Sequence, residues 1–150
     1  MTSLYLPDPA ASHDLGVRLA SVVRAGDVIT LSGPLGAGKT SIARGLLAAL
    51  GLAGEAPSPS FAIVQPYDPP EVRLPVLHID LYRIDDPAEI DELGLDEARG
   101  FSLLLIEWPE HGGPDAWADA LALTLTVADD GSRALTADVP AAWEDRWSRI

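Results

Sequence analysis

The sequence predicts an α/β fold in which helices pack on both sides of a mixed parallel and antiparallel sheet. A short apolar strand at 27–32 runs into a glycine-rich loop and then into an amphipathic helix at 39–50. Two further apolar runs, 74–82 and 101–108, carry acidic residues near their C-terminal ends. Alternating segments at 120–127 and 133–139 flank a polar turn, which is typical of an antiparallel hairpin. Strand–helix units followed by a hairpin predict the mixed sheet.

The N-terminal half contains two predicted helices. Within residues 8–24 apolar side chains recur at helical spacing, and Ser12 is the predicted N-cap. In the helix at 39–50 the apolar residues again share one face, and Gly51 follows as the C-cap. The residues that define the two apolar faces are Leu15, Leu19, Val22 and Val23 in the first helix, and Ile42, Leu46, Leu47 and Leu50 in the second.

The remaining elements alternate in type. We expect a strand at 60–65, the two apolar strands at 74–82 and 101–108, and between them an acidic helix at 86–98 that Gly94 interrupts. The hairpin at 120–127 and 133–139 has one wet face, and residues 140–150 close the chain as a short helix.

Length and composition limit the function. At 150 residues the chain is expected to form a single domain over 1–150. It has no cysteine, which excludes disulfides and thiolate metal sites. No basic leader and no apolar run of membrane-spanning length is present, so we expect a cytoplasmic protein without a membrane segment. The net charge of −13 argues against direct nucleic-acid binding and fits docking to a basic partner.

The strongest motif is the loop from Gly33 to Thr40, which reads G-P-L-G-A-G-K-T and matches G-x-x-x-x-G-K-[ST]. Its glycines allow backbone N–H groups to turn toward a β-phosphate. Lys39 supplies a charge for the β- and γ-phosphates, and the Thr40 hydroxyl is a Mg²⁺ ligand. The helix that follows directs its positive end at the same anion. We therefore predict nucleoside triphosphate binding in a P-loop NTPase-like three-layer fold.

Two carboxylates qualify as partners of this loop. Asp80 directly follows the apolar run LPVLHI (74–79), and Glu107 directly follows the run FSLLLI (101–106). At such a strand end a carboxylate can face the phosphates. One can hold Mg²⁺ directly or through water, and the other can orient the attacking water. For either acid alone, capping a turn or pairing with an arginine is the alternative.

Other residues near these carboxylates have two readings each. We interpret His78 as a packed, hydrogen-bonded residue, with metal ligation as the alternative. Trp108 either stacks near the nucleotide or belongs to the core, and Arg83 either pairs with Asp80 or reaches a phosphate. We interpret Ser58–Phe61 as an ordinary proline-containing loop, and the alternative is a switch segment that senses the γ-phosphate.

The nucleotide is predicted to be ATP. Guanine specificity usually rests on N-K-x-D, and this chain contains no asparagine. A small-molecule kinase usually has an arginine-bearing lid over the phosphates. The arginines between the loop and Glu107 form no compact lid.

Together, the segments GPLGAGKT, SPSFAIVQPY, HIDLYRIDDPAEIDELGLDE and LLLIEWPEH resemble the TsaE (YjeE) family, over about residues 12–111. The resemblance implies an ATPase component of the bacterial machinery that makes threonylcarbamoyladenosine in tRNA beside the anticodon. It implies partners similar to TsaD and TsaB, which carry the transfer chemistry and the tRNA contacts.

The resemblance also implies roles for residues. Thr40 and Glu107 would hold Mg²⁺, Asp80 would act beside the metal, and Ser60 would be a switch-like hydroxyl. The expected catalytic residues are Lys39, Asp80 and Glu107. The expected nucleotide-binding residues are Gly33, Gly36, Ala37, Gly38, Lys39, Thr40, Ser41, Ser60 and Trp108. Two positions depart from the family pattern: Pro34 replaces an aspartate, and Ser60 replaces a threonine.

The hypothesis from sequence is an Mg²⁺-dependent ATPase, slow alone and dependent on its partners, that drives or resets a tRNA-modifying assembly. Two other hypotheses stay open. A P-loop small-molecule kinase would place phosphate on a metabolite, and a nucleotide-gated assembly switch would hydrolyse ATP only incidentally.

Overall fold

The computed structural model describes residues 2–54, 64–113 and 116–150. Its described strands form one seven-stranded sheet with the order β1-β7-β6-β2-β5-β4-β3. Strands β4, β5, β2 and β6 run parallel, whereas β1, β7 and β3 pair antiparallel with their neighbours. The predicted mixed sheet is confirmed. The strands are β1 Thr2–Leu6, β2 Val28–Ser32, β3 Val64–Tyr67, β4 Val76–Asp80, β5 Leu103–Glu107, β6 Leu121–Val127 and β7 Arg133–Asp138.

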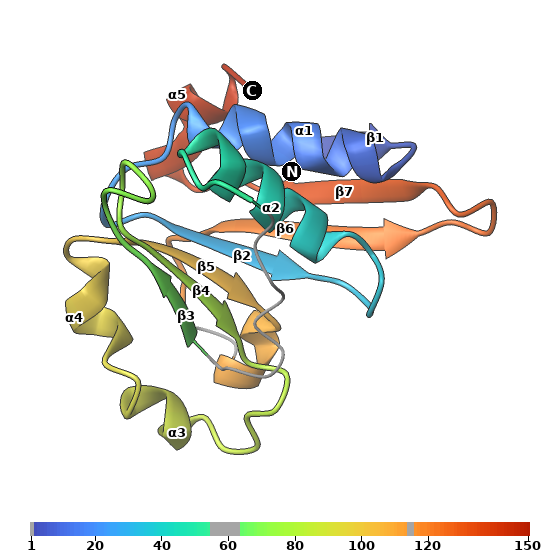
Figure 1. The fold of residues 1–150 in the computed structure, drawn as a ribbon. Coiled ribbons are helices and arrows are strands. Elements are labelled where there is room, and N and C mark those ends of the chain that lie inside the picture. The colour runs from blue at the N-terminus through green and yellow to red at the C-terminus, as the bar shows by residue number, and fades with distance from the viewer. Residues whose placement is uncertain (1, 55–63, 114–115) are drawn as a thin grey trace.

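Helices lie on both faces of this sheet (Figure 1). The helices α1 (Pro9–Ala20) and α2 (Lys39–Ala49) cover one face, over the larger apolar core. A smaller apolar cluster on the other face packs under α3 (Ala88–Asp91) and α4 (Leu95–Arg99). This arrangement confirms the three-layer fold. No helix in the described ranges combines the length and hydropathy that crossing a membrane requires.

Two predicted helices differ in detail. The first begins at Pro9 and its N-cap is Asp8, whose Oδ1 accepts a hydrogen bond of 2.9 Å from Ala11 N, so the prediction of Ser12 as N-cap is wrong. Proline favours the first helical position because its φ is preset and it has no N–H to satisfy. The acidic segment forms two short helices, α3 and α4, because Gly94 between them adopts a left-handed conformation with φ 66°. The strand β1 adds to the predicted elements and pairs with β7.

Contact between α1 and α2 depends on two glycines. A Cβ atom on Gly16 of α1 would lie 2.0 Å from the carbonyl oxygen of Ile42 in α2. A Cβ atom on Gly45 of α2 would likewise lie 2.0 Å from the carbonyl oxygen of His13 in α1. The two helix backbones therefore approach so closely that neither position accommodates a side chain. This packing fixes α2, and with it the loop that precedes α2.

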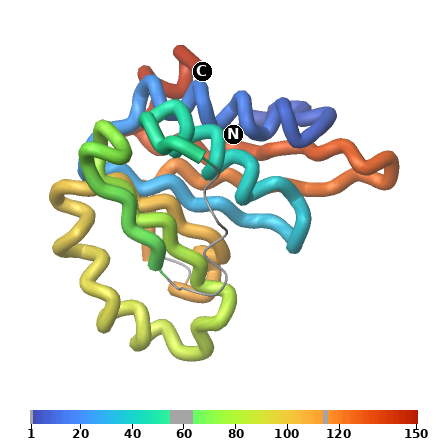
Figure 2. The backbone as a smooth tube through the Cα atoms, viewed as in Figure 1, coloured from blue at the N-terminus to red at the C-terminus, as the bar shows by residue number. Residues whose placement is uncertain are grey.

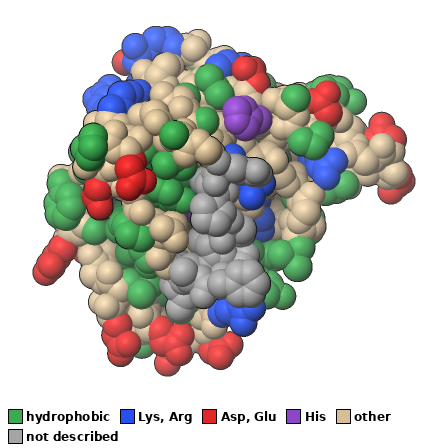
Figure 3. All heavy atoms as spheres, viewed as in Figure 1, with side chains coloured by type: hydrophobic (Ala, Val, Ile, Leu, Met, Phe, Trp, Pro, Cys, Tyr) green, Lys and Arg blue, Asp and Glu red, His purple; other side chains and the backbone are tan. Residues whose placement is uncertain are grey.

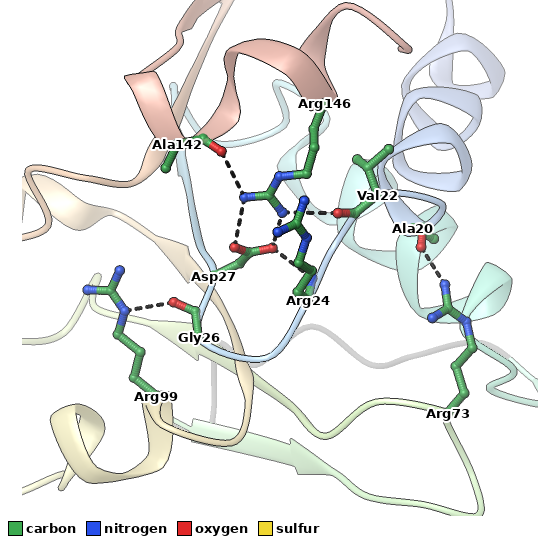
Figure 4. A network of polar contacts seen from close by, with 9 residues as sticks. All are labelled: Ala20, Val22, Arg24, Gly26, Asp27, Arg73, Arg99, Ala142 and Arg146. Atoms are coloured by element: carbon green, nitrogen blue, oxygen red, sulfur yellow. Dashed lines mark hydrogen bonds and ion pairs between the residues drawn. The ribbon is translucent and has the colours of Figure 1, made fainter.

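A buried arginine joins the C-terminal end of the chain to the start of β2 (Figure 4). Arg146, which lies in α5 (Glu144–Trp147) after the 3-10 helix η3 (Ala141–Trp143), is only 4% exposed. Its guanidinium donates to both carboxylate oxygens of Asp27, at 2.6 and 3.1 Å, and to the carbonyl oxygen of Val22 at 3.0 Å. Arg18 of α1 donates to the carbonyl oxygen of Ile150 at 2.8 Å. The C-terminus therefore lies beside α1, as the backbone path in Figure 2 also shows.

We predict that Gly16→Ala and Gly45→Ala each destabilise the protein, because the added methyl group must push α1 and α2 apart. Overpacking of this kind costs about 1–3 kcal/mol, which lowers the melting temperature of a chain of this size by several degrees. Thermal unfolding followed by circular dichroism measures the effect. Gly100→Ala is the matched control. Its φ is −59°, and its Cβ would make an ordinary contact at 3.4 Å. Melting temperatures for Gly16→Ala and Gly45→Ala equal to that of Gly100→Ala would contradict the close packing.

Candidate functional site

The glycine-rich loop between β2 and α2 needs its glycines for conformation and for space. Gly33, Gly36 and Gly38 all have positive φ, at 143°, 78° and 108°. A Cβ atom on Gly33 would also lie 2.8 Å from the carbonyl oxygen of Leu125 in β6. A backbone with φ in this positive range is strained for any residue with a side chain. The loop therefore has the tight turn that its sequence predicts.

Two residues distant in sequence contact this loop. Arg133, the first residue of β7, donates from Nη2 to the carbonyl oxygen of Gly36 at 2.9 Å. Ser12 of α1 is 1% exposed, its Oγ has no hydrogen-bond partner, and it would lie 3.3 Å from a Cβ atom on Gly38. Arg133 of the hairpin therefore holds the loop by a hydrogen bond, and Ser12 of α1 lies against it. The sequence pattern indicates neither contact.

Asp80 and Glu107 lie next to each other at the edge of the sheet where this loop begins. They are the last residues of β4 and β5 and are paired in the parallel register. Glu107 is in turn paired with Leu31 of β2, one residue before the end of that strand. Asp80 and Glu107 are 7% and 4% exposed. Parallel strands end at a common edge, so the fold gathers both carboxylates beside the loop.

A pocket of about 240 Å³ lies between the loop and these strand ends. Nearly all the predicted site residues that the structure describes line it, whereas Gly33 and Ala37 shape the loop behind it. Ser60 and the rest of Ser58–Phe61 lie outside the described residues. The lining residues are Leu35, Gly36, Gly38, Lys39, Thr40, Ser41, Asp80, Glu107 and Trp108.

The Lys39 side chain is folded inward beside the pocket. Its Nζ donates to the carbonyl oxygen of Gly33 at 2.7 Å and lies 3.7 Å from the centroid of the Trp108 ring, a cation–π contact. The residue is only 4% exposed. Burial lowers the pKa of the Lys39 ammonium below its usual range. The nearby negative charges of Glu107, Asp80 and Glu110 oppose this shift and are outweighed.

Trp108 has an unusual backbone. Its φ of 59° is the only positive φ of a non-glycine residue in the described part of the chain. A bulky residue in this region is strained, and packing holds it there. Its ring centroid lies 5.0 Å from that of Tyr82 and 5.9 Å from that of His111. The left-handed turn directly after Glu107 thereby places an aromatic face over Lys39. Trp108 belongs both to the pocket lining and to the edge of the smaller apolar cluster.

The surroundings of Asp80 resolve one predicted alternative. Its Oδ1 accepts a hydrogen bond of 2.9 Å from the backbone N–H of Tyr82, which fixes the turn after β4. Arg83 is exposed and forms no ion pair with Asp80 among the described residues. The proposed Arg83–Asp80 pair is therefore wrong, because the turn directs Arg83 to solvent. Contact of Arg83 with a phosphate stays a prediction.

His78 is packed and hydrogen-bonded, as the sequence indicates. It is 1% exposed, and its Nε2 lies 2.7 Å from Oε2 of Glu107. A carboxylate can only accept, so we assign the hydrogen to Nε2 of the imidazole. The sequence leaves this partner unidentified. The available signal is spacing: His78 and Asp80 are two residues apart in a strand and share a face, and Asp80 is paired with Glu107.

The donor set suits a hard cation held jointly with phosphate. Within the described ranges no group of three or more His, Cys, Asp or Glu side chains could hold a metal ion alone. Mg²⁺ commonly uses one or two protein oxygens and completes its shell with water and phosphate oxygens. Thr40 and the two strand-end carboxylates fit that requirement because they line one pocket beside a phosphate-type loop.

The fold is a three-layer α/β protein with a mixed sheet, and a strand, glycine-rich loop and helix lie at its carboxyl edge. The sequence model of a family described as "Threonylcarbamoyl adenosine biosynthesis protein TsaE" matches residues 6–135. The chain belongs to the TsaE family.

Individual relatives agree with this assignment. The chain is 37% identical to a tRNA threonylcarbamoyladenosine biosynthesis protein TsaE of Streptomyces coelicolor over 85% of this chain and 96% of that one. It is 34% identical to the Bacillus subtilis protein of that name, over 86% and 80%. The crystal structure of Bacillus subtilis YdiB superposes with a TM-score of 0.79 at 29% identity, covering 99% of this chain and 94% of that one. The likeness extends over the whole fold, including the N-terminal strand and the C-terminal hairpin.

We predict that Lys39→Met raises the stability of the nucleotide-free protein. A lysine whose pKa is lowered on folding destabilises the folded state while it is charged. That cost is full below the folded-state pKa and disappears as pH rises through the folded and then the unfolded pKa. A gain of about 1 kcal/mol raises the melting temperature by about 2–4 °C for this chain length. Thermal melts at pH 7 and near pH 10 measure it, and the gain should shrink at the higher pH.

Arg149→Met is the control for this prediction. It removes an exposed cation near the chain end and should leave the free energy of unfolding within about 0.5 kcal/mol of the wild type. A marked loss of stability in Lys39→Met at pH 7 would show that the lysine is a net stabilising partner of the carboxylates.

Proposed function

We propose that this protein binds Mg²⁺–ATP in the pocket and hydrolyses it as the ATPase component of tRNA threonylcarbamoyladenosine biosynthesis, in the cytoplasm. The observation that carries the proposal is the convergence of Lys39, Thr40, Asp80 and Glu107 on one pocket at the carboxyl edge of parallel strands. Membership of the TsaE family supports the biological role.

In this proposal the loop binds the phosphates. Backbone N–H groups of the loop and of the first turn of α2 surround the β-phosphate. Lys39 exchanges its hydrogen bond to Gly33 O and its contact with Trp108 for the β- and γ-phosphates. Lys39 already lines the pocket in which the phosphates would bind. Ser41 and the Trp108 ring bound the same pocket and position the nucleotide.

The two carboxylates have different roles in this proposal, one in metal binding and one in orienting water. Thr40 and Glu107 would hold Mg²⁺, which when bound neutralises charge on the phosphate oxygens. Asp80 would orient the attacking water, since its Oδ1 is already fixed by Tyr82 N and its position next to Glu107 places it beside the metal site. Ser60 stays a prediction for the γ-phosphate-sensing hydroxyl.

The charge distribution supports indirect contact with tRNA. The net charge is −13, and acidic side chains gather on the surface around α3 in Figure 3. A polyanion is repelled by such a surface at low ionic strength. We propose that partners similar to TsaD and TsaB contact the tRNA and perform the transfer. ATP hydrolysis by this chain would drive or reset the assembly that they form.

Asp80→Asn and Glu107→Gln should bind ATP but hydrolyse it about 10²–10³-fold more slowly, because each removes charge directed at the reacting phosphate or its metal. Lys39→Met should lose about 10–100-fold in ATP affinity, as expected for a charge-assisted contact of about 1.5–3 kcal/mol. Isothermal titration calorimetry measures binding. Phosphate release measures hydrolysis, with and without partner proteins and tRNA. Asp129→Asn, an exposed acid in the hairpin turn, is the matched control.

The same variants test the biological role in cells that depend on this gene. Asp80→Asn, Glu107→Gln and Lys39→Met should fail to restore threonylcarbamoyladenosine in tRNA, measured by mass spectrometry of nucleosides, whereas Asp129→Asn should restore it. Normal modification by hydrolysis-defective variants would instead indicate a nucleotide-gated switch. Transfer of labelled phosphate from ATP to a metabolite would indicate a kinase.

A further inference from the structure

The Glu107 carboxylate is oriented by one buried side chain. Within the described chain its only side-chain hydrogen bond runs from Nε2 of His78 to Oε2, at 2.7 Å. His78 and Glu107 are 1% and 4% exposed, so water does not replace this bond. The second oxygen, Oε1, has no partner among the described residues, and Glu107 lines the pocket. One oxygen is thus held and the other is left available.

The strand register explains why His78 reaches this oxygen. His78 of β4 is paired with Leu105 of β5, and Asp80 is paired with Glu107. Residues two apart in a strand share a face, so His78 lies one step behind the Asp80–Glu107 pair, toward the core. Glu107 lines the pocket, whereas His78 is not among the residues that line it.

Burial at position 78 is energetically unfavourable for a histidine. His78 lies in the apolar run of β4 between Val76 and Ile79, and its Nδ1 is buried without a hydrogen-bond partner. A buried polar atom left unpaired costs about 1–3 kcal/mol. An aliphatic side chain avoids that cost but offers Glu107 no donor. The one bond that His78 makes is therefore its distinctive contribution to the site.

We propose that His78 is a positioning residue for the metal site: it fixes Oε2 of Glu107 so that Oε1 faces the pocket as a ready ligand beside Thr40. This inference rests on the proposed function, in which Glu107 holds Mg²⁺. Outer residues that orient metal ligands typically contribute 10–100-fold in metal affinity. His78 itself contacts neither metal nor nucleotide in this arrangement.

The test compares ADP affinity with and without Mg²⁺ by titration calorimetry. The ratio of the two dissociation constants isolates the metal contribution. His78→Leu should reduce this ratio about tenfold or more and leave the metal-free ADP affinity unchanged, since the loop and Lys39 make the phosphate contacts. In a second readout, the electron paramagnetic resonance signal of Mn²⁺ should show weaker Mn²⁺ binding to the ADP complex of His78→Leu.

Conservative variants separate positioning from packing. His78→Gln places an amide N–H near the position of Nε2 and should restore most of the metal effect. His78→Asn carries its amide too far back and should resemble His78→Leu. The Gln and Asn comparison holds even where His78→Leu folds poorly. His13→Gln, at an exposed position in α1, is the control and should match the wild type.

A double-mutant cycle completes the test. In Glu107→Gln, addition of His78→Leu should have no further effect on the metal ratio, because the two residues act through one bond. An undiminished Mg²⁺ effect in both His78→Leu and His78→Asn would overturn the inference, as would equal losses in the Gln and Asn variants. Failure of the wild type to bind ADP would instead overturn the proposed function on which the inference rests.

Discussion

The parallel register of β2, β5 and β4 is the constraint on which the site depends. It brings Leu31, Glu107 and Asp80 to the same level, one residue before β2 passes into the glycine-rich loop. A shift of one residue in either pairing would turn a carboxylate to the opposite face of the sheet. The register is secured by apolar side chains on both faces of β5, whose five residues are all buried. Core packing therefore determines where the charges lie.

The site places three charged side chains in a buried environment, which is energetically unfavourable. Lys39, Asp80 and Glu107 are each less than a tenth exposed, and they face one another across the pocket. Burial outweighs these attractions at Lys39, since its pKa is lowered. The strained backbone of Trp108 adds a further local cost. Functional sites commonly combine such unfavourable features with support from rigid elements, here the glycine-mediated contact of α1 with α2.

The sequence predicts those parts of the structure that local patterns encode. The phosphate-type loop, the strand-end carboxylates and the hairpin are each visible within a few residues, and the mixed sheet follows from their order. Contacts between distant residues are different. Arg133 with Gly36, His78 with Glu107 and Arg146 with Asp27 join positions 97, 29 and 119 residues apart. Periodicity alone does not reveal such pairs. For His78 it gives only the shared face with Asp80, and the partner Glu107 follows from the strand register. The N-cap prediction at Ser12 is wrong for a local reason, because Asp8 followed by Pro9 is the stronger start signal.

The position of the bound metal tests the central claim most directly. Crystals grown with ADP and Mn²⁺ would locate the ion by its anomalous scattering. We expect one ion within about 2.0–2.3 Å of both Thr40 Oγ1 and a carboxylate oxygen of Glu107, with Asp80 beyond direct coordination. An ion held by Asp80 without Glu107, or one bound away from Thr40, would contradict the assignment of these residues.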